Sequence, residues 1–280
     1  MSTTGNATTS NVNEGAPEIG NTMTNPENTA GSHSDPSADA DIEAVIEALL
    51  QAVPEAVPES EPHAVLGRVF QGVLFDMDGT LVDSTMAVNR SWQRWADEIG
   101  IGALFAGVQH GRPAREMVAD LVPADQVEAG IARVGELELS DTSDITILPG
   151  AAELMASLPE ERRAIVTSCT HDLCRIRLAA AGFEAPATVV TIEDTAKGKP
   201  APDPFLEAAD RLGLDARQCV VIEDAPAGLA AGRAAGCATI GVVGTHSADE
   251  LDADLVVPSL DRLRIERHAH GVVFLISPES

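Results

Sequence analysis

From residue 69 onward, the chain alternates short apolar, β-branched runs with segments of helical periodicity. Five runs have the length and composition of buried strands: VFQGVLF, RAIVTS, ATVVTI, QCVVIED and ATIGVVG. The helical patterns between them carry glycine stops. Strands that are apolar on both faces are typical of parallel sheets, so the order predicts an α/β fold with helices on both faces of a parallel sheet. Such sheets bind ligands beyond the carboxyl ends of their strands.

The composition changes sharply before this alternation begins. Residues 1–67 contain no Lys, no Arg and no aromatic residue, and they hold 11 acidic residues. A segment with so little apolar bulk rarely folds, so we predict that residues 1–67 form a disordered acidic tail. Residues 41–53, with the sequence DIEAVIEALLQAV, have helical spacing. We favour a marginal helix lying on the domain over the alternative, a docking helix for a protein partner.

The charge and the cysteines limit the setting in which the protein works. A net charge of −26 argues against binding to nucleic acid and to anionic membranes. The first residues lack the pattern of a signal peptide, and no apolar run reaches the length that spans a bilayer. The cysteines show no CxxC spacing and lie in apolar segments, which predicts reduced, partly buried thiols in a cytoplasmic protein. They are Cys169, Cys174, Cys219 and Cys237.

One segment, residues 84–147, breaks the alternation with an all-helical pattern. Its two clearest helix faces are formed by Val88, Trp92, Trp95 and Ile99 and by Val127, Ile131 and Val134. We predict that both tryptophans fill a small core in this insert, and that the insert acts as a lid because it follows the first strand directly. The α/β core then consists of residues 68–83 and 148–280. Within it, the last segment predicts two short strands around a turn at His270 and Gly271, as a small edge addition.

Carboxylates stand at two of the predicted strand ends. Asp76 and Asp78 follow the first strand at positions i and i+2, so they face the same side, and Gly79 permits a sharp turn after them. The fourth strand ends in Glu223 and Asp224. Converging carboxylates repel one another unless a cation lies between them. Oxygen ligands without Cys or His indicate Mg²⁺.

Hydroxyl groups and lysines complete the pattern. Thr167 and Ser168 end the second strand just before a helix, where hydroxyl and N–H groups could hold an anion, although both residue types are also common helix caps. The chain has 16 arginines but only two lysines, Lys197 and Lys199, and both lie in KGKPAPDPF. A compact ammonium suits a phosphate oxygen or an aspartate in a crowded site. We predict that Lys199 is the functional lysine and that Lys197 is the more exposed one.

In this order, the segments FDMDGT, AIVT, GKPAPDPF and VVIEDAPAG resemble the four motifs of the haloacid dehalogenase (HAD) superfamily of phosphotransferases, over about residues 69–265. The resemblance implies a doubly wound, Rossmann-like core with an inserted small α-helical cap. Within the superfamily, the chain resembles the sugar phosphatases and the glycerol-3-phosphate phosphatases, and most of all the bacterial enzymes acting on hexose and hexitol phosphates. It therefore implies a Mg²⁺-dependent phosphatase for small sugar or polyol phosphates.

The resemblance also implies a role for each motif residue. Asp76 would attack phosphorus and form an aspartyl-phosphate, and Asp78 would serve as acid and then as base. Lys199 and Mg²⁺ would neutralise charge, while Thr167, with nearby backbone N–H groups, would hold the phosphate oxygens.

The implied metal ligands come from the two acidic motifs. They are the carboxylates of Asp76 and Asp224, the backbone carbonyl of Asp78, and Glu223 as an outer or water-mediated ligand. In the insert, the loop GVQHGRPAREM presents His110 and Arg112, which either contact the substrate or belong to an ordinary helix–helix turn.

Three other functions remain as alternatives. Phosphomutases related to β-phosphoglucomutase share all four motifs but carry a His ten residues after the second Asp, where this chain has Val88, and their first motif tends to end in Gly-Val rather than Gly-Thr. A non-catalytic phospho-acceptor of the response-regulator type would be shorter and would lack a cap. A partner-binding module would use the acidic tail, with catalysis secondary. The substrate itself stays open among glycerol, hexose, hexitol and deoxysugar phosphates, because contacts in the cap set such preferences.

Overall fold

The computed structural model describes residues 65–105, 107, 108 and 113–277. The predicted helix at 41–53 and the cap-loop residues His110 and Arg112 lie outside the described residues. Val65 is buried and Leu66 pairs with Phe274. The folded core therefore includes Val65 and Leu66, which fall within the predicted tail, because these apolar side chains pack on it.

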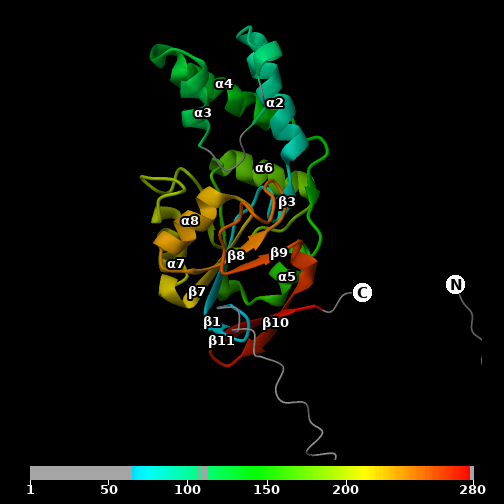
Figure 1. Ribbon diagram of the computed structural model, residues 1–280, viewed down its shortest axis with the longest axis vertical. Helices are drawn as coiled ribbons and strands as arrows, with labels where there is room; N and C mark the ends of the chain where they lie inside the picture. Colours follow the sequence, from blue (N-terminus) through cyan, green and yellow to red (C-terminus); the bar gives the residue numbers. More distant parts are fainter. Residues whose placement is uncertain (1–64, 106, 109–112, 278–280) are drawn as a thin grey trace, which may run out of the picture. The chain divides into compact units, whose positions relative to one another are not determined.

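A six-stranded sheet forms the centre of the fold (Figure 1), in the order β6-β5-β2-β7-β8-β9. Its strands are β2 (Gly72–Phe75), β5 (Arg163–Val166), β6 (Val189–Val190), β7 (Cys219–Glu223), β8 (Ala238–Val242) and β9 (Leu255–Val257). All neighbouring strands are parallel, as the sequence predicts. From β2 the chain runs outward to β6, then crosses back to β7 on the other side of β2. The order of the strands thus reverses at β2 and β7, where sheets of this type bind ligands.

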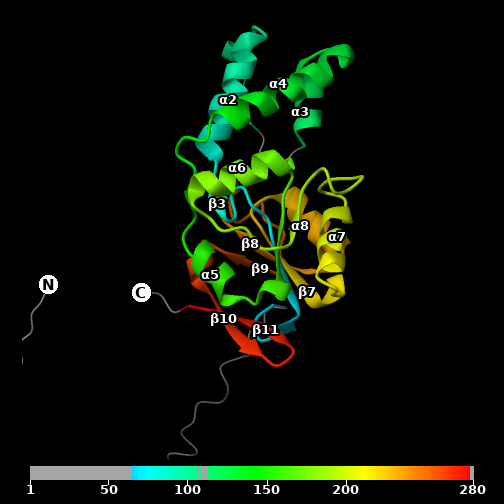
Figure 2. The same cartoon turned by 180° about the vertical axis from the view of Figure 1, so that it is seen from behind.

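Helices cover both faces of this sheet, as Figures 1 and 2 show. On one face, α5 (Ala151–Ser157) and α6 (His171–Ala181) share an apolar cluster with the sheet. On the other face, α7 (Asp203–Arg211) and α8 (Pro226–Ala234) form a second cluster. The bounds of α6 follow from its sequence, because the Thr170 hydroxyl caps its first turn and Gly182 ends it with a φ of 69°. Short 3₁₀ turns span Glu160–Arg162, Ala216–Gln218 and Leu260–Arg262.

The first predicted strand is in fact two strands in two sheets. β1 (Val69–Phe70) ends before Gln71, and the next strand, β2, begins directly after this residue. β1 pairs with β11 (Gly271–Ile276), which pairs in turn with β10 (Leu263–His268). The predicted C-terminal hairpin is therefore present, but it belongs to a separate three-stranded sheet and is not an edge of the main one. The ring of Phe70 packs edge-on against Phe274, with centroids 6.1 Å apart, and so holds β1 to the hairpin.

The described residues of the insert form three helices, α2 (Thr85–Glu98), α3 (Ala114–Leu121) and α4 (Val127–Ser140), with 3₁₀ turns at Gly102–Leu104 and Ala124–Gln126. The two chain segments that connect it to the core pair antiparallel, as β3 (Val82–Asp83) and β4 (Thr146–Ile147).

The insert has an apolar core of its own. Trp92 and Trp95 are buried there with their rings edge to face, which confirms the prediction for both tryptophans. The prediction for Ile99 is wrong, because α2 ends at Glu98 and the Ile99 side chain is 37% exposed. The role of the insert as a lid stays a prediction.

Two further observations concern the setting. Among the described helices, none combines the length and the hydropathy needed to cross a membrane. All four cysteines are buried and carry free thiols, in agreement with the prediction from their spacing.

Candidate active site

The site is built around a buried lysine and aspartate. Asp76 directly follows β2, and its N–H donates to the carbonyl of Ile222 on β7 at 2.9 Å. Lys199 reaches it from the loop between β6 and α7. Its ammonium donates to Oδ1 of Asp76 at 2.5 Å, to Oε1 of Glu223 at 2.9 Å and to the carbonyl of Val166 at 2.9 Å. These contacts use all three N–H donors, so the ammonium is fixed in place. Lys199 is thus the buried lysine, as the sequence predicts.

Three carboxylates cluster here, those of Asp76, Glu223 and Asp224, and the first two contact the single ammonium. Burial raises the pKa of Asp76, and Glu223 adds to the rise while Lys199 opposes it. Burial and the charges of Glu223 and Asp76 likewise raise the pKa of Asp224. For Lys199, burial lowers the pKa, but Asp76 and Glu223 outweigh it and the net shift is upward. The lysine therefore stays protonated, and the cluster still carries more negative than positive charge when its acids ionise.

This arrangement fits a divalent cation. Asp76, Glu223 and Asp224 each offer a carboxylate oxygen, and these atoms lie within 4.8 Å of one another. The donor set contains oxygen only, which suits Mg²⁺. Gly79 lies so close that a Cβ at this position would stand 2.1 Å from Oδ2 of Asp224, and its φ of +87° also favours glycine. Glu223 is less free than the other two, because it accepts from Lys199 and from the N–H of Ala225 at 2.6 Å.

Asp78 points elsewhere than Asp76. Its Oδ1 accepts a hydrogen bond from Oγ of Ser84 at 2.5 Å and lies 3.0 Å from Nη1 of Arg177, while Oδ2 accepts from Sγ of Cys169 at 3.1 Å. Burial raises the pKa of the Cys169 thiol, so this thiol remains an S–H donor. The carboxylate of Asp78 is not part of the acidic group. The predicted metal contact through its backbone carbonyl stays a prediction.

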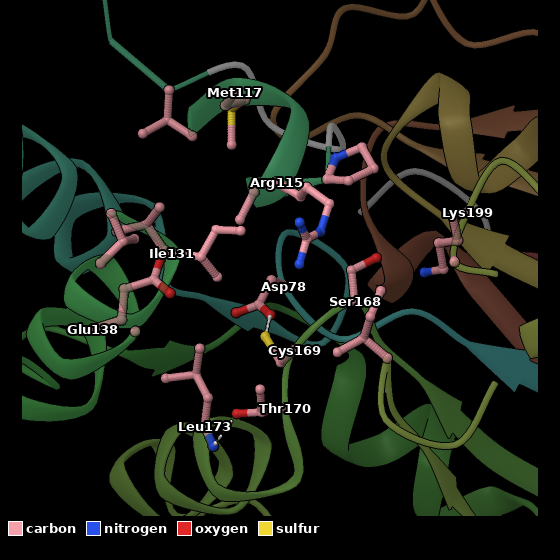
Figure 3. A pocket seen from close by; sticks show the side chains of 18 of the residues that line it. Asp78, Arg115, Met117, Ile131, Glu138, Ser168, Cys169, Thr170, Leu173 and Lys199 are labelled. Carbon is pink, nitrogen blue, oxygen red and sulfur yellow. Dashed lines mark hydrogen bonds between the residues drawn. The ribbon is translucent and has the colours of Figure 1, made fainter. Parts of the chain in front are cut away.

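The predicted anion-binding residues end the neighbouring strand β5. Thr167 is buried, and its Oγ1 accepts from the N–H of Cys169 at 3.2 Å, which leaves its hydroxyl hydrogen available to a ligand. Ser168 is exposed and lines the pocket beside Asp78 (Figure 3). Both residues precede α6, so backbone N–H groups are also available here.

A pocket of about 1090 Å³ lies between the insert and the strand ends. Its core side includes Asp78, Ser168 and Lys199, and its insert side includes Trp92, Met117, Ile131 and Glu138. In Figure 3, Glu138 and Lys199 lie on opposite sides of Asp78. The pocket also contains Arg115, an exposed residue that pairs with Glu128. The structure thus places one described cap arginine at the pocket, three residues after Arg112.

Sequence reasoning missed two residues of this site, Arg177 and Glu138. Arg177 lies on the buried face of α6 with Leu173 and Leu178, and it is 4% exposed. Glu138 continues the apolar stripe of α4 that includes Val134. A charged residue on an apolar helix face was the available signal, since such residues are rarely buried without a partner.

Comparisons with known proteins found related sequences and similar structures. A family model described as haloacid dehalogenase-like hydrolase matches residues 70–236. Hexitol phosphatase A of Escherichia coli is 40% identical over 213 residues, which are 73% of this chain and 98% of that protein. Glycerol-1-phosphate phosphohydrolase 2 of Saccharomyces cerevisiae is 31% identical, over 69% of this chain and 83% of that protein. Among solved structures, a hydrolase from Pseudomonas syringae has a TM-score of 0.60 and 27% identity, covering 68% of this chain and 94% of that one.

Proposed function

The chain belongs to the haloacid dehalogenase-like hydrolases, and we propose that it hydrolyses sugar or polyol phosphates through an aspartyl-phosphate on Asp76. It is a phosphatase acting on phosphate monoesters, like its named relatives. The observation that carries the mechanism is the buried pair of Asp76 and Lys199, which stands where β2 and β7 end, with Lys199 lining the pocket under the cap.

In the first step, an oxygen of Asp76 attacks phosphorus and the bond to the leaving oxygen breaks. Lys199 holds the Asp76 carboxylate in one orientation and keeps a positive charge beside the incoming dianion. Thr167 donates its free hydroxyl hydrogen to a phosphate oxygen. Held by Asp76, Asp224 and the backbone carbonyl of Asp78, with Glu223 further out, Mg²⁺ would supply the remaining positive charge.

Asp78 acts as the general acid and then as the general base. It protonates the alkoxide that leaves in the first step, and it then takes a proton from the water that hydrolyses the aspartyl-phosphate. Val88, which occupies the position of a mutase histidine, is buried and carries no titratable group. This supports hydrolysis over transfer to a second sugar phosphate.

The pocket supports a substrate larger than glycerol phosphate. Its volume of about 1090 Å³ lies just above the usual range of about 300–1,000 Å³ for small-molecule pockets. Its walls combine apolar residues such as Trp92 and Ile131 with polar ones such as Ser168, whose hydroxyl suits a substrate with several hydroxyl groups. We therefore favour hexitol and hexose phosphates, with glycerol phosphate as the second candidate because of the yeast relative.

The setting proposed for this reaction is the cytoplasm. The four free, buried thiols support a reducing compartment. The net charge of −26 argues against binding to nucleic acid or to anionic membranes. The tail remains a candidate site for a protein partner.

A phosphate-release assay over a panel of esters tests the proposed function. The panel contains hexitol phosphates, hexose phosphates, 2-deoxyhexose phosphates, glycerol phosphates and p-nitrophenyl phosphate. We expect phosphate release in the presence of Mg²⁺, with the highest kcat/KM for a hexitol or hexose phosphate. Release from none of these esters would overturn the proposed function, and a preference for glycerol phosphates would select the second candidate.

Stabilisation by Mg²⁺ should depend on pH. Burial raises the pKa of Asp76 from its ordinary value of 3.8 to about 7. Between these two values the metal-free folded protein binds more protons than the unfolded chain, so its stability falls as the pH rises through this window. Mg²⁺ binds the ionised carboxylates, and protons compete with it. We therefore expect MgCl₂ to raise the melting temperature more at pH 8 than at pH 5.

Thermal unfolding followed by circular dichroism, with and without MgCl₂, measures this effect. Asp224→Asn removes one proposed ligand and should reduce the Mg²⁺ effect at both pH values. Asp252→Asn alters a surface carboxylate paired with Arg233 and serves as the control. An equal Mg²⁺ effect at pH 5 and pH 8, or an unchanged effect in Asp224→Asn, would contradict the assigned site.

A further inference from the structure

A buried arginine links the two parts of the site. Arg177 stands on α6, in the core, with its side chain 5% exposed. Its Nη1 lies 3.0 Å from Oδ1 of Asp78 and donates to Sγ of Cys169 at 3.0 Å. Its Nη2 lies 3.4 Å from Oε1 of Glu138 on α4, in the cap. One guanidinium is therefore shared by two carboxylates, one from the catalytic loop of the core and one from the cap.

The cap side of this link is itself held in place. Nε1 of Trp92, on α2, donates to Oε1 of Glu138 at 3.1 Å. α4 packs directly against α6, so the contact between Glu138 and Arg177 lies on the surface where cap and core meet. The side chain of Glu138 is 14% exposed, and burial raises its pKa while Arg177 opposes the rise.

The chemistry of an arginine explains why this arrangement orients Asp78. A guanidinium is planar and always charged, and its donors point in fixed directions. When it is buried, it requires partners on its donors, because an unpaired buried charge is costly. Arg177 meets Asp78 with one nitrogen and Glu138 with the other. The position of Glu138 therefore helps to fix the plane of the guanidinium, and that plane, together with Ser84 and Cys169, helps to fix where the Asp78 carboxyl points.

We propose that Arg177 is a positioning residue, which aims the Asp78 carboxyl at the leaving oxygen and makes that aim depend on the seating of the cap through Glu138. The inference rests on the proposed function, since it concerns the acid and base of that reaction. Proton transfer requires the acid to lie within hydrogen-bond reach of the leaving oxygen. A cap that is not seated leaves Arg177 without Glu138, so Asp78 keeps Ser84 and Cys169 but loses a guanidinium of fixed orientation beside it. Proton transfer is thus fastest over an enclosed substrate.

The dependence of the phosphorylation rate on the leaving group distinguishes a positioning role from a purely structural one. An alkoxide needs a proton as it leaves, whereas p-nitrophenolate leaves without one. Loss of the aim of Asp78 should therefore slow phosphorylation of the enzyme by an alkyl phosphate and spare phosphorylation by p-nitrophenyl phosphate. General damage to the fold would slow both.

The first experiment compares Arg177→Met and Arg177→Lys with Arg175→Met, a change of an exposed arginine on the same helix. The rate of the first step is measured in single turnovers with the best alkyl phosphate of the panel, and from the p-nitrophenol burst. For Arg177→Met we expect a loss of about 10²-fold with the alkyl phosphate and less than about threefold with p-nitrophenyl phosphate. Arg177→Lys should recover part of the loss, and Arg175→Met should match the wild type.

The second experiment approaches the link from the cap and decides the matter if Arg177→Met does not fold. Glu138→Gln keeps the shape of the side chain and removes its charge. We expect a loss of about tenfold in the alkyl phosphate rate, since the pair is weakened rather than removed, again with little change for p-nitrophenyl phosphate. Glu98→Gln is the control, because Glu98 pairs with Arg133 elsewhere in the cap.

The outcomes separate this inference from the proposed function. Equal slowing of both esters in the Arg177 variants and in Glu138→Gln would overturn the positioning role, and so would the absence of any slowing. If the wild type hydrolyses neither ester, the proposed function itself fails, and the inference fails with it.

Discussion

Asparagine in place of Asp76 is expected to lower kcat by about 10⁴-fold or more on every phosphate ester that the enzyme accepts, because no other group can replace the nucleophile. The amide has nearly the shape of the carboxylate but cannot form the acyl phosphate. Lys199 keeps its contacts with Glu223 and with the carbonyl of Val166. The fold should therefore persist, and steady-state phosphate release is the measurement.

Stability is the control for this variant. Asp76 is one of three clustered carboxylates that repel one another, and burial raises its pKa. Removal of its charge should leave the melting temperature of the metal-free protein unchanged or higher at pH 8. Retained turnover in a well-folded Asp76→Asn protein would exclude Asp76 as the nucleophile.

Replacement of Lys199 by methionine should affect stability as well as catalysis. The change leaves Asp76, Glu223 and Asp224 buried without their ammonium. Loss of one partner from a buried ion pair typically costs about 3–5 kcal/mol, and we expect the free energy of unfolding at pH 8 to fall by this order. Methionine still fills the space beside the ring of Phe205, whose centroid lies 5.3 Å from the lysine nitrogen. The loss therefore reflects charge rather than a cavity.

Urea unfolding of the metal-free protein measures this effect, and Lys197→Met is the matched control because Lys197 is exposed. The same Lys199→Met variant should lose kcat by about 10²–10³-fold, the usual cost of removing one electrostatic contact to a transition state. Asp76→Asn added to Lys199→Met should restore part of the stability, since it removes one uncompensated carboxylate. Equal stability of the Lys199→Met and wild-type proteins would contradict the inference that Lys199 offsets the buried charges of Asp76 and Glu223.

The parts of the fold that the sequence predicts are those with local signals. Apolar runs with glycine stops predict the parallel sheet and its helices, and the four motifs predict which strand ends meet. The sixth strand, β9, was missed because Leu255–Val257 is short and lies among acidic residues. The break at Gln71 was also missed, because the two strands on either side are equally apolar and only pairing with the distant β11 separates them.

The same distinction holds within the site. Asp76 and Lys199 can be predicted from their sequence motifs, and the contact between them follows once the strand order is known. The link from Asp78 through Arg177 to Glu138 joins three segments with no shared pattern, so it requires the packed structure. The sequence carries only a hint of it, in the form of charged residues on apolar helix faces. The cap loop with His110 and Arg112 lies outside the described residues, and its two interpretations both stand.

Trapping of the phosphorylated enzyme tests the proposed mechanism most directly. Asp78→Asn should slow hydrolysis of the intermediate, because it lacks the base that activates water. This variant is mixed with p-nitrophenyl phosphate and Mg²⁺, quenched, and treated with borohydride, which reduces an acyl phosphate of aspartate to homoserine. We predict that mass spectrometry of the digested protein will find homoserine at position 76, only when the ester is present. A burst of p-nitrophenol without homoserine at position 76, or with the modification at another residue, would contradict the mechanism.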